Sequence, residues 1–344
     1  MAAVSRDFLA FQSARLERWL ALHRIPVRVD RALVVDGWIR FEMTSASGVD
    51  LPTLWNMRGE IASALGSADA HVTETDSAFA LEVPRPDSEP VTLLGLLAQL
   101  TDIPLLSACV GLAHDGRPLL IRLPSDEVGN VLITGGEGTG KTELMRALLL
   151  SLALTHRQSQ VQMALFDSRR GGLAPLRELP HLLTPVAASP AGAEALLARL
   201  LAEVERREEA RVNSPHIIAA IDDFPELLNL SGREAKTHLA QLVQRGRPAG
   251  VSLIVGARPS PGLGALPRAD FPVRLVGRVA SSDEAREASG IGNSGAEFLA
   301  GHGSFVAVAN GQPIPFRIAW VPPHEWASAL ARIGNPVMSS APEA

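Results

Sequence analysis

Cysteine is almost absent from this chain of 344 residues. Cys109 is the only one, so no internal disulfide can form, which is typical of proteins that work in a reducing cytoplasm. Zinc is also disfavoured, because the nine histidines are scattered and neither a CxxC nor an HExxH motif occurs. Since Cys109 lies within the apolar stretch 105–110, we expect a packed core side chain rather than a reactive thiol.

Long hydrophobic runs and a surplus of basic residues are missing as well. No window approaches eighteen uncharged apolar residues, so we expect no membrane insertion. Residues 4–22 interleave charged and apolar side chains, which predicts an amphipathic helix rather than a signal peptide. The net charge is −5 and the pI is near 6.0, whereas a monomeric nucleic-acid binder is usually basic. Contact with DNA would therefore need basic side chains concentrated on one surface.

The most informative stretch that is present is Gly-Gly-Glu-Gly-Thr-Gly-Lys-Thr, residues 135–142. It fits the phosphate-binding pattern GxxxxGK[ST], and it lies between an apolar strand (131–134) and a helix rich in leucine (143–153). Glycines let backbone N–H groups point at an anion, and the helix N-terminus adds partial positive charge. Lys141 can reach the β- and γ-phosphates, and the Thr142 hydroxyl can ligate Mg²⁺. We therefore predict a site for ATP and Mg²⁺ formed by Gly135, Gly136, Glu137, Gly138, Thr139, Gly140, Lys141, Thr142 and Glu143.

A second acidic element follows another apolar strand. Residues 217–221 are Ile-Ile-Ala-Ala-Ile and lead directly into Asp222 and Asp223. Ligands of parallel sheets bind at the carboxyl ends of strands, and the distance along the chain from Lys141 leaves room for a strand between the two motifs. In an ATPase of this kind Asp222 would hold Mg²⁺ together with Thr142, and Asp223 would act as general base on the attacking water. The alternative is an aspartate pair that opens a turn before Pro225.

The order of the predicted elements indicates two domains and a tail. Residues 1–90 read as a small α+β domain that ends in a proline-rich break, residues 91–333 as the ATPase domain, and residues 334–344 as a disordered tail. Alternating strands and helices in the second domain predict an α/β fold with a mostly parallel sheet, helices on both faces, and the last strands as an antiparallel edge. The strand candidates are 118–122, 130–134, 161–166, 216–221, 251–256, 272–278, 304–308 and 315–320, and the helix candidates are 141–154, 190–211, 232–244, 282–288 and 324–333.

Further segments carry a family resemblance. Besides the two motifs, these are Phe166–Arg169, Pro180–Val186, Asp222–Leu227, Gln244–Leu253, Arg258–Ser260 and Gly295–Gly301. With them, residues 25–320 resemble the FtsK/SpoIIIE family of hexameric DNA-translocating ATPases. The resemblance implies a RecA-like P-loop ATPase in a homo-oligomeric ring of six subunits that couples ATP hydrolysis to movement along double-stranded DNA.

The resemblance also implies roles for four arginines. In such rings a neighbouring subunit supplies an arginine to the γ-phosphate, and Arg247 is the first candidate and Arg274 the second. Either could instead form a surface or interface ion pair. Arg258 and Arg268 lie on or near a loop that would face the pore, where we expect non-specific contacts with DNA phosphates.

The sequence departs from the family pattern at several points. Asp223 stands in place of the family's catalytic glutamate, and the segment before Arg258 is one residue short, so a polar glutamine is missing. The stretch 211–216 is short, and we expect neither a winged-helix module after residue 320 nor a membrane anchor before residue 1. Two alternatives stay open at this point. One is an ATP-gated assembly module with weak hydrolysis, and the other is a motor that acts on protein substrates, as in type VII secretion or conjugation.

Overall fold

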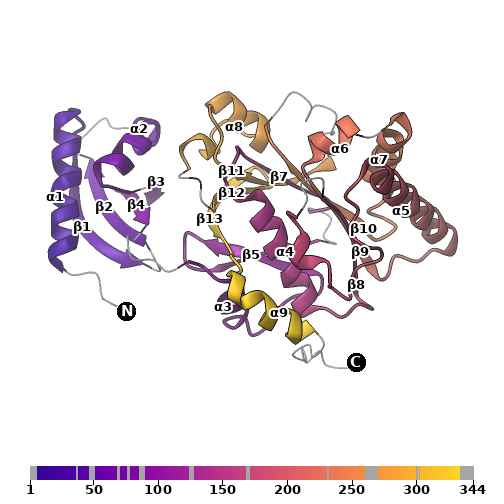
Figure 1. Ribbon diagram of the computed structural model, residues 1–344. Coiled ribbons are helices and arrows are strands. Elements are labelled where there is room, and N and C mark those ends of the chain that lie inside the picture. Colours follow the sequence, from indigo (N-terminus) through magenta and orange to yellow (C-terminus); the bar gives the residue numbers. More distant parts are fainter. Residues whose placement is uncertain are drawn as a thin grey trace. The chain divides into compact units, whose positions relative to one another are not determined.

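The computed structural model describes residues 6–35, 38–45, 51–67, 70–75, 78–84, 90–123, 128–167, 171–230, 232–259, 270–299, 301 and 303–333. The chain divides into two compact units (Figure 1). The first consists of residues 1–90, 114–117 and 298–300, and the second consists of residues 91–113, 118–297 and 301–344. That the two units are separate folding domains stays a prediction, and the expected disordered tail lies outside the described residues.

The small unit is an antiparallel sheet packed against two helices. Its strands run in the order β1-β2-β4-β3, and every neighbouring pair is antiparallel. In β2, Ile39, Phe41 and Met43 alternate into the core, where they meet Leu16 of the first helix and Leu54 of the second. This alternation has the period of two that is typical of a half-buried strand. The elements are α1 (Arg6–Leu22), β1 (Val27–Val35), β2 (Trp38–Ser45), α2 (Leu51–Ala64), β3 (His71–Thr75) and β4 (Ala78–Pro84).

The large unit is built on one nine-stranded sheet with the order β6-β5-β13-β12-β11-β7-β10-β9-β8. The strands from β11 to β8 pair in parallel, and the strands from β12 to β6 pair antiparallel. Their bounds are β5 (Ser107–Ala113), β6 (Pro118–Arg122), β7 (Val131–Thr134), β8 (Val161–Asp167), β9 (His216–Asp222), β10 (Val251–Ala257), β11 (Val273–Gly277), β12 (Ser304–Ala309) and β13 (Gln312–Ile318).

Helices cover both faces of the parallel strands, as the unbroken apolar strands predict. Ile133, Ile218 and Ile254 pack on one face against α4, and Ile221 and Leu253 pack on the other against α5 and α7. In Figure 1 the two helix layers flank β7, β10 and β9. The helices are α3 (Leu93–Leu97), α4 (Lys141–Thr155), α5 (Pro190–Ala210), α6 (Phe224–Leu230), α7 (Arg233–Arg245), α8 (Ser282–Ser289) and α9 (Trp326–Ile333).

The antiparallel half of the sheet is larger than predicted. Strands β12 and β13 lie inside the sheet, between β11 and β5, so the prediction that the last strands form an edge is wrong. The strands at that edge are β5 and β6, and β5 is not among the strand candidates from the sequence. Cys109 lies in β5 and is fully buried, and burial raises the pKa of its thiol to about 11. The expectation that Cys109 is packed in the core is therefore confirmed.

No helix among the described residues is long and apolar enough to cross a membrane.

Candidate nucleotide site

The candidate site lies where parallel strands of the large sheet end. β10 pairs with β7 on one side and with β9 on the other, so the carboxyl ends of the three strands share one edge. Thr134 of β7 pairs with Ala257 of β10, and Asp222 ends β9 one residue beyond the last pair with β10. This arrangement places one strand between the phosphate loop and the acidic pair, as the sequence separation allowed.

The phosphate loop has a backbone that only glycine adopts readily. Gly135, Gly138 and Gly140 have φ angles of 150°, 73° and 104°, in the region that L side chains rarely enter. Gly140 then caps the N-terminus of α4. A helix N-terminus preceded by such a loop directs N–H groups at an anion.

The Lys141 side chain is folded back over its own loop. Its Nζ donates to the carbonyl oxygens of Gly135 and Gly136, at 2.8 and 2.6 Å. The loop is also tied to its surroundings, because the Gly136 amide donates to the Arg278 carbonyl at 2.7 Å and the Thr139 carbonyl accepts from Gly303. The ammonium charge is therefore already at the loop that would hold phosphates.

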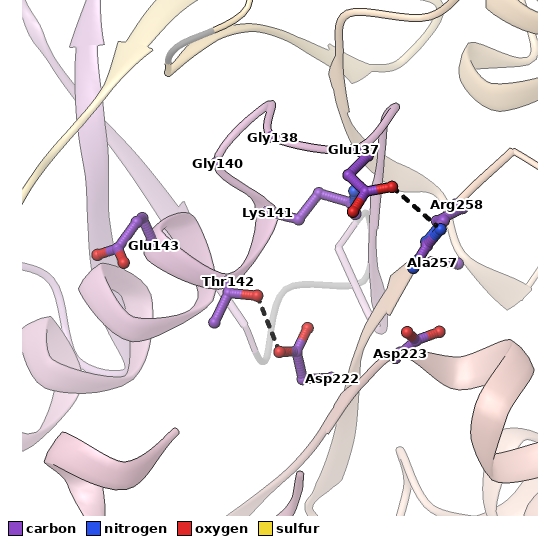
Figure 2. A pocket seen from close by; sticks show the side chains of 10 residues that line it. All are labelled: Glu137, Gly138, Gly140, Lys141, Thr142, Glu143, Asp222, Asp223, Ala257 and Arg258. Atoms are coloured by element: carbon purple, nitrogen blue, oxygen red, sulfur yellow. Dashed lines mark hydrogen bonds and ion pairs between the residues drawn. The ribbon is translucent and has the colours of Figure 1, made fainter. Parts of the chain in front are cut away.

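One pocket of about 290 Å³ contains residues from both motifs. This volume is near the lower end of ordinary small-molecule sites, which suits the phosphate end of a nucleotide. Ala257 at the end of β10 forms part of the wall between the motifs. Figure 2 shows the lining, which consists of Glu137, Gly138, Gly140, Lys141, Thr142, Glu143, Asp222, Asp223, Ala257 and Arg258.

A direct hydrogen bond joins the two motifs. Thr142 Oγ1 donates to Asp222 Oδ2 at 2.9 Å, although the two residues lie 80 positions apart (Figure 2). Asp222 is buried, with 4% of its surface exposed. A hydroxyl and a carboxylate are the hard oxygen donors that Mg²⁺ takes beside substrate phosphates. The pair therefore fits a magnesium ion that neutralises phosphate charge when it is bound.

Asp223 has two structural roles at once. Its φ of 63° is left-handed, which is uncommon for a residue with a side chain, and its backbone carbonyl accepts from the amides of Glu226 and Leu227. It thus opens α6, as the turn interpretation of the acidic pair expected, and it also lines the pocket. Strained backbone of this kind clusters at functional sites. The role of general base stays a prediction.

Three other predicted residues take positions that the sequence did not specify. Glu143 pairs with Arg146, and in Figure 2 its carboxylate points away from Lys141. Glu137 faces Arg258 at 3.5 Å, and both side chains line the pocket. Arg258, expected at DNA, therefore lies beside the phosphate loop, and Arg268 lies outside the described residues. Their contacts with DNA stay predictions.

The two candidate trans arginines are absent from the described pocket lining. Arg247 is exposed on the turn before β10, and its Cδ lies 3.5 Å from a Cβ added at Gly129, which precedes β7. Because β7 and β10 are parallel, this is the end of the strands opposite Lys141. Arg274 lies in β11, half-buried, and donates from Nε to the Phe271 carbonyl at 3.3 Å.

Sequence reasoning missed the residues behind the pocket. Asp167 ends β8 and is the register partner of Asp222. It was noticed only as part of a family-like segment, although an aspartate at the end of an apolar strand is the same signal that identified Asp222. Arg146 and Gly172, which lie beside it, carry no comparable signal.

Comparisons with known proteins show which family this chain resembles. Residues 99–212 match the model of the FtsK/SpoIIIE family. These residues are therefore similar to an FtsK/SpoIIIE family domain. It is 27% identical to DNA translocase FtsK of Staphylococcus aureus (strain Mu50 / ATCC 700699) over 88% of this chain and 42% of that protein. It is 28% identical to DNA translocase SftA of Bacillus subtilis (strain 168) over 92% of this chain and 36% of that protein. The resemblance noted in the sequence is confirmed, and the chain spans less than half the length of these relatives.

Solved structures show the same fold. The pCW3 conjugation coupling protein TcpA, in its monomer form with ATPγS, superposes with a TM-score of 0.61 at 16% identity, covering 94% of this chain and 99% of that one. The cytoplasmic domain of the Thermomonospora curvata type VII secretion ATPase EccC gives 0.59 at 21% identity, covering 74% and 35%. These similarities confirm the predicted RecA-like P-loop ATPase fold.

Proposed function

We propose that this chain is the motor part of an ATP-driven DNA translocase of the FtsK/SpoIIIE type. The observation that carries the proposal is the hydrogen bond from Thr142 to Asp222, which joins the phosphate loop and the acidic strand end within one pocket. The track is inferred from the relatives named DNA translocase. Double-stranded DNA is the partner that this family assignment favours.

The phosphate loop and the acidic pair then have separate roles in ATP hydrolysis. The amides of the phosphate loop and the Lys141 ammonium bind the β- and γ-phosphates, and Thr142 and Asp222 hold Mg²⁺. A magnesium ion held by these two residues would neutralise negative charge on the phosphates during hydrolysis. Asp223, at the pocket wall, orients the attacking water and accepts its proton.

Assembly into a ring would complete the site. Phosphoryl transfer gains from an arginine that approaches the γ-phosphate, and Arg247 lies at the opposite strand ends from its own Lys141. It can therefore reach a γ-phosphate only in a neighbouring copy of the chain. We propose a homo-oligomer, with six subunits as in the resembled family, in which ATP lies at the contacts between subunits.

The test is the steady-state ATPase rate with and without long duplex DNA. We expect stimulation at low salt that declines as salt rises, because neutralisation of DNA phosphates releases counterions. Lys141→Ala is the control for contaminating activity, since it removes the charge that faces the phosphates. A rate at low salt that does not respond to duplex DNA would reject the DNA motor.

A second function is favoured by Asp223, which is one methylene shorter than glutamate. Such a chain could bind ATP to close a ring and recruit a partner while hydrolysing little. Light scattering with a slowly hydrolysed ATP analogue, with and without DNA, measures assembly directly. If the Asp223→Glu variant assembles but hydrolyses no faster than wild type, the assembly module is supported; a large gain in rate supports a slowed motor.

A further inference from the structure

The turn Gly171–Leu173, which follows β8, lies directly behind the Thr142–Asp222 pair. A Cβ added at Gly172 would lie 2.9 Å from Asp222 Oδ2 and 3.3 Å from Thr142 Cγ2. Cβ atoms essentially never approach other atoms within 3.0 Å, so a side chain at this position would displace the carboxylate. Gly172 is not among the glycines with positive φ. The position therefore requires small size rather than backbone freedom.

Two charged side chains hold this turn by hydrogen bonds. The buried carboxylate of Asp167 accepts from the amide of Gly171 at 3.3 Å and from the amide of Leu173 at 2.8 Å. Arg146 of α4 donates from Nε to the Gly172 carbonyl and from Nη2 to the Gly171 carbonyl. Leu173 is fully buried in the core. The turn is thus fixed through its N–H groups, its carbonyl groups and its apolar side chain.

The free-energy cost of burying the Asp167 carboxylate indicates that this turn does more than connect two elements. Burying a carboxylate is unfavourable unless hydrogen bonds compensate it, and Asp167 has only 1% of its surface exposed. Neither Asp167 nor Arg146 is among the described residues that line the pocket. The nearest heavy atom to a Cβ added at Gly172 is Asp222 Oδ2, and this same oxygen accepts from Thr142. A small shift of the turn would therefore move the oxygen that the proposed magnesium site uses.

We propose that the turn Gly171–Leu173 positions the magnesium-binding pair, and that Asp167 and Arg146 are positioning residues acting through Gly172. This inference rests on the proposed function, because it takes Thr142 and Asp222 as the magnesium pair. Residues that orient metal ligands typically change metal affinity by about 10- to 100-fold when they are substituted. Without magnesium, nucleotide binds through the loop amides and Lys141, so a change behind Asp222 is expected to leave this metal-independent affinity intact.

The decisive experiment compares Gly172→Ala with Gly292→Ala. Gly292 is an exposed glycine, also without positive φ, and a Cβ added there would meet no described atom within 4 Å. Equilibrium binding of a fluorescent ATP analogue is measured in EDTA and across a magnesium titration. Gly172→Ala is expected to raise the half-saturating Mg²⁺ concentration by about 10- to 100-fold while changing the affinity in EDTA little. Gly292→Ala is expected to match wild type in both conditions.

Arg146→Gln provides an independent variant if Gly172→Ala does not fold. Its control is Arg286→Gln, because Arg286 also pairs with an acidic residue three positions away but lies exposed on α8. Arg146→Gln should raise the half-saturating Mg²⁺ concentration. Arg146→Lys should raise it less, and Arg286→Gln should leave it at the wild-type value.

The outcomes separate this inference from the proposed function. If folded Gly172→Ala or Arg146→Gln has the wild-type half-saturating Mg²⁺ concentration, the positioning role is overturned, but the proposed function is not affected. Equal losses of nucleotide affinity with and without magnesium also overturn the positioning role, because they indicate that the whole pocket is deformed. If the wild-type chain itself binds the nucleotide without any dependence on magnesium, the proposed function fails and this inference fails with it.

Discussion

His216 should make the large unit sensitive to mild acid. It is the first residue of β9, only 6% exposed, and its Nε2 lies 3.0 Å from Ser252 Oγ of β10. Burial, and secondarily the charge of Arg207, lowers the pKa of His216 from its ordinary 6.5 to about 4. The native state therefore keeps this imidazole neutral at a pH where the unfolded chain already binds a proton.

The size and sign of the effect follow from this difference. The unfolded state binds more protons as pH falls below 6.5, so the contribution of His216 is fully present above that pH and is lost progressively towards pH 4. Between pH 7 and pH 5 the loss comes to about 2 kcal/mol, since a tenfold change in proton affinity corresponds to about 1.4 kcal/mol. For a unit of roughly 150–250 residues, this lowers the melting temperature by about 4–8 °C.

The assay is a series of melting temperatures from pH 8 to pH 5 for wild type and His216→Gln. Glutamine can still reach Ser252 but takes up no proton, so the variant should lose about 4–8 °C less than wild type over this range. Other titrating groups act equally in both proteins and cancel in the comparison. His324→Gln, at an exposed histidine, is the control and should follow wild type. Parallel curves for wild type and His216→Gln would refute the reasoning.

Three further predictions concern the candidate site. Lys141→Ala should abolish ATP turnover in a steady-state assay, because it removes the ammonium beside the loop; retained activity would mean that the loop is misinterpreted. Glu137→Ala should tighten ATP binding by up to about fivefold, the scale of one exposed ion pair, because it releases Arg258 and removes a negative charge at the pocket; calorimetry that shows weaker binding would contradict this. Arg247→Ala and Lys141→Ala should each be inactive alone but regain activity when mixed, since one subunit then supplies the arginine and the other the intact loop. An Arg247→Ala ring with the wild-type rate would exclude that residue as the trans arginine.

The sequence was informative where a short apolar strand ends in polar residues. Residues 131–134 and 217–221 could be placed in a parallel sheet, and parallel strands bring their carboxyl ends to one edge. The approach of Thr142 to Asp222 follows from that geometry alone, and the structure gives it as 2.9 Å. The chemical roles assigned to these residues depend on a bound nucleotide and stay predictions.

The order of the antiparallel strands could not be read from the sequence, because it depends on pairing between distant segments. The register of β5 shifts between Cys109 and Gly111, and most of its residues are buried, so it shows no clear alternation. A Cβ added at Gly111 would lie 2.1 Å from the Arg317 carbonyl, which shows that this glycine is set by β13, some 200 residues later. Local sequence patterns do not show contacts between segments so far apart, so this strand could not be predicted from them.

The two ends of the candidate site differ in how far they are prepared for a ligand. At the metal end, Thr142 and Asp222 already touch, and the turn behind them is held by two charged side chains. At the phosphate end, Lys141 occupies its own loop carbonyls, so nucleotide must replace two hydrogen bonds with contacts to phosphate. An ammonium gains more from a charged phosphate than from neutral carbonyls, so this exchange favours binding. The rearrangement on binding is therefore expected at the lysine and not at the magnesium pair, because moving Asp222 would require the buried turn to move with it.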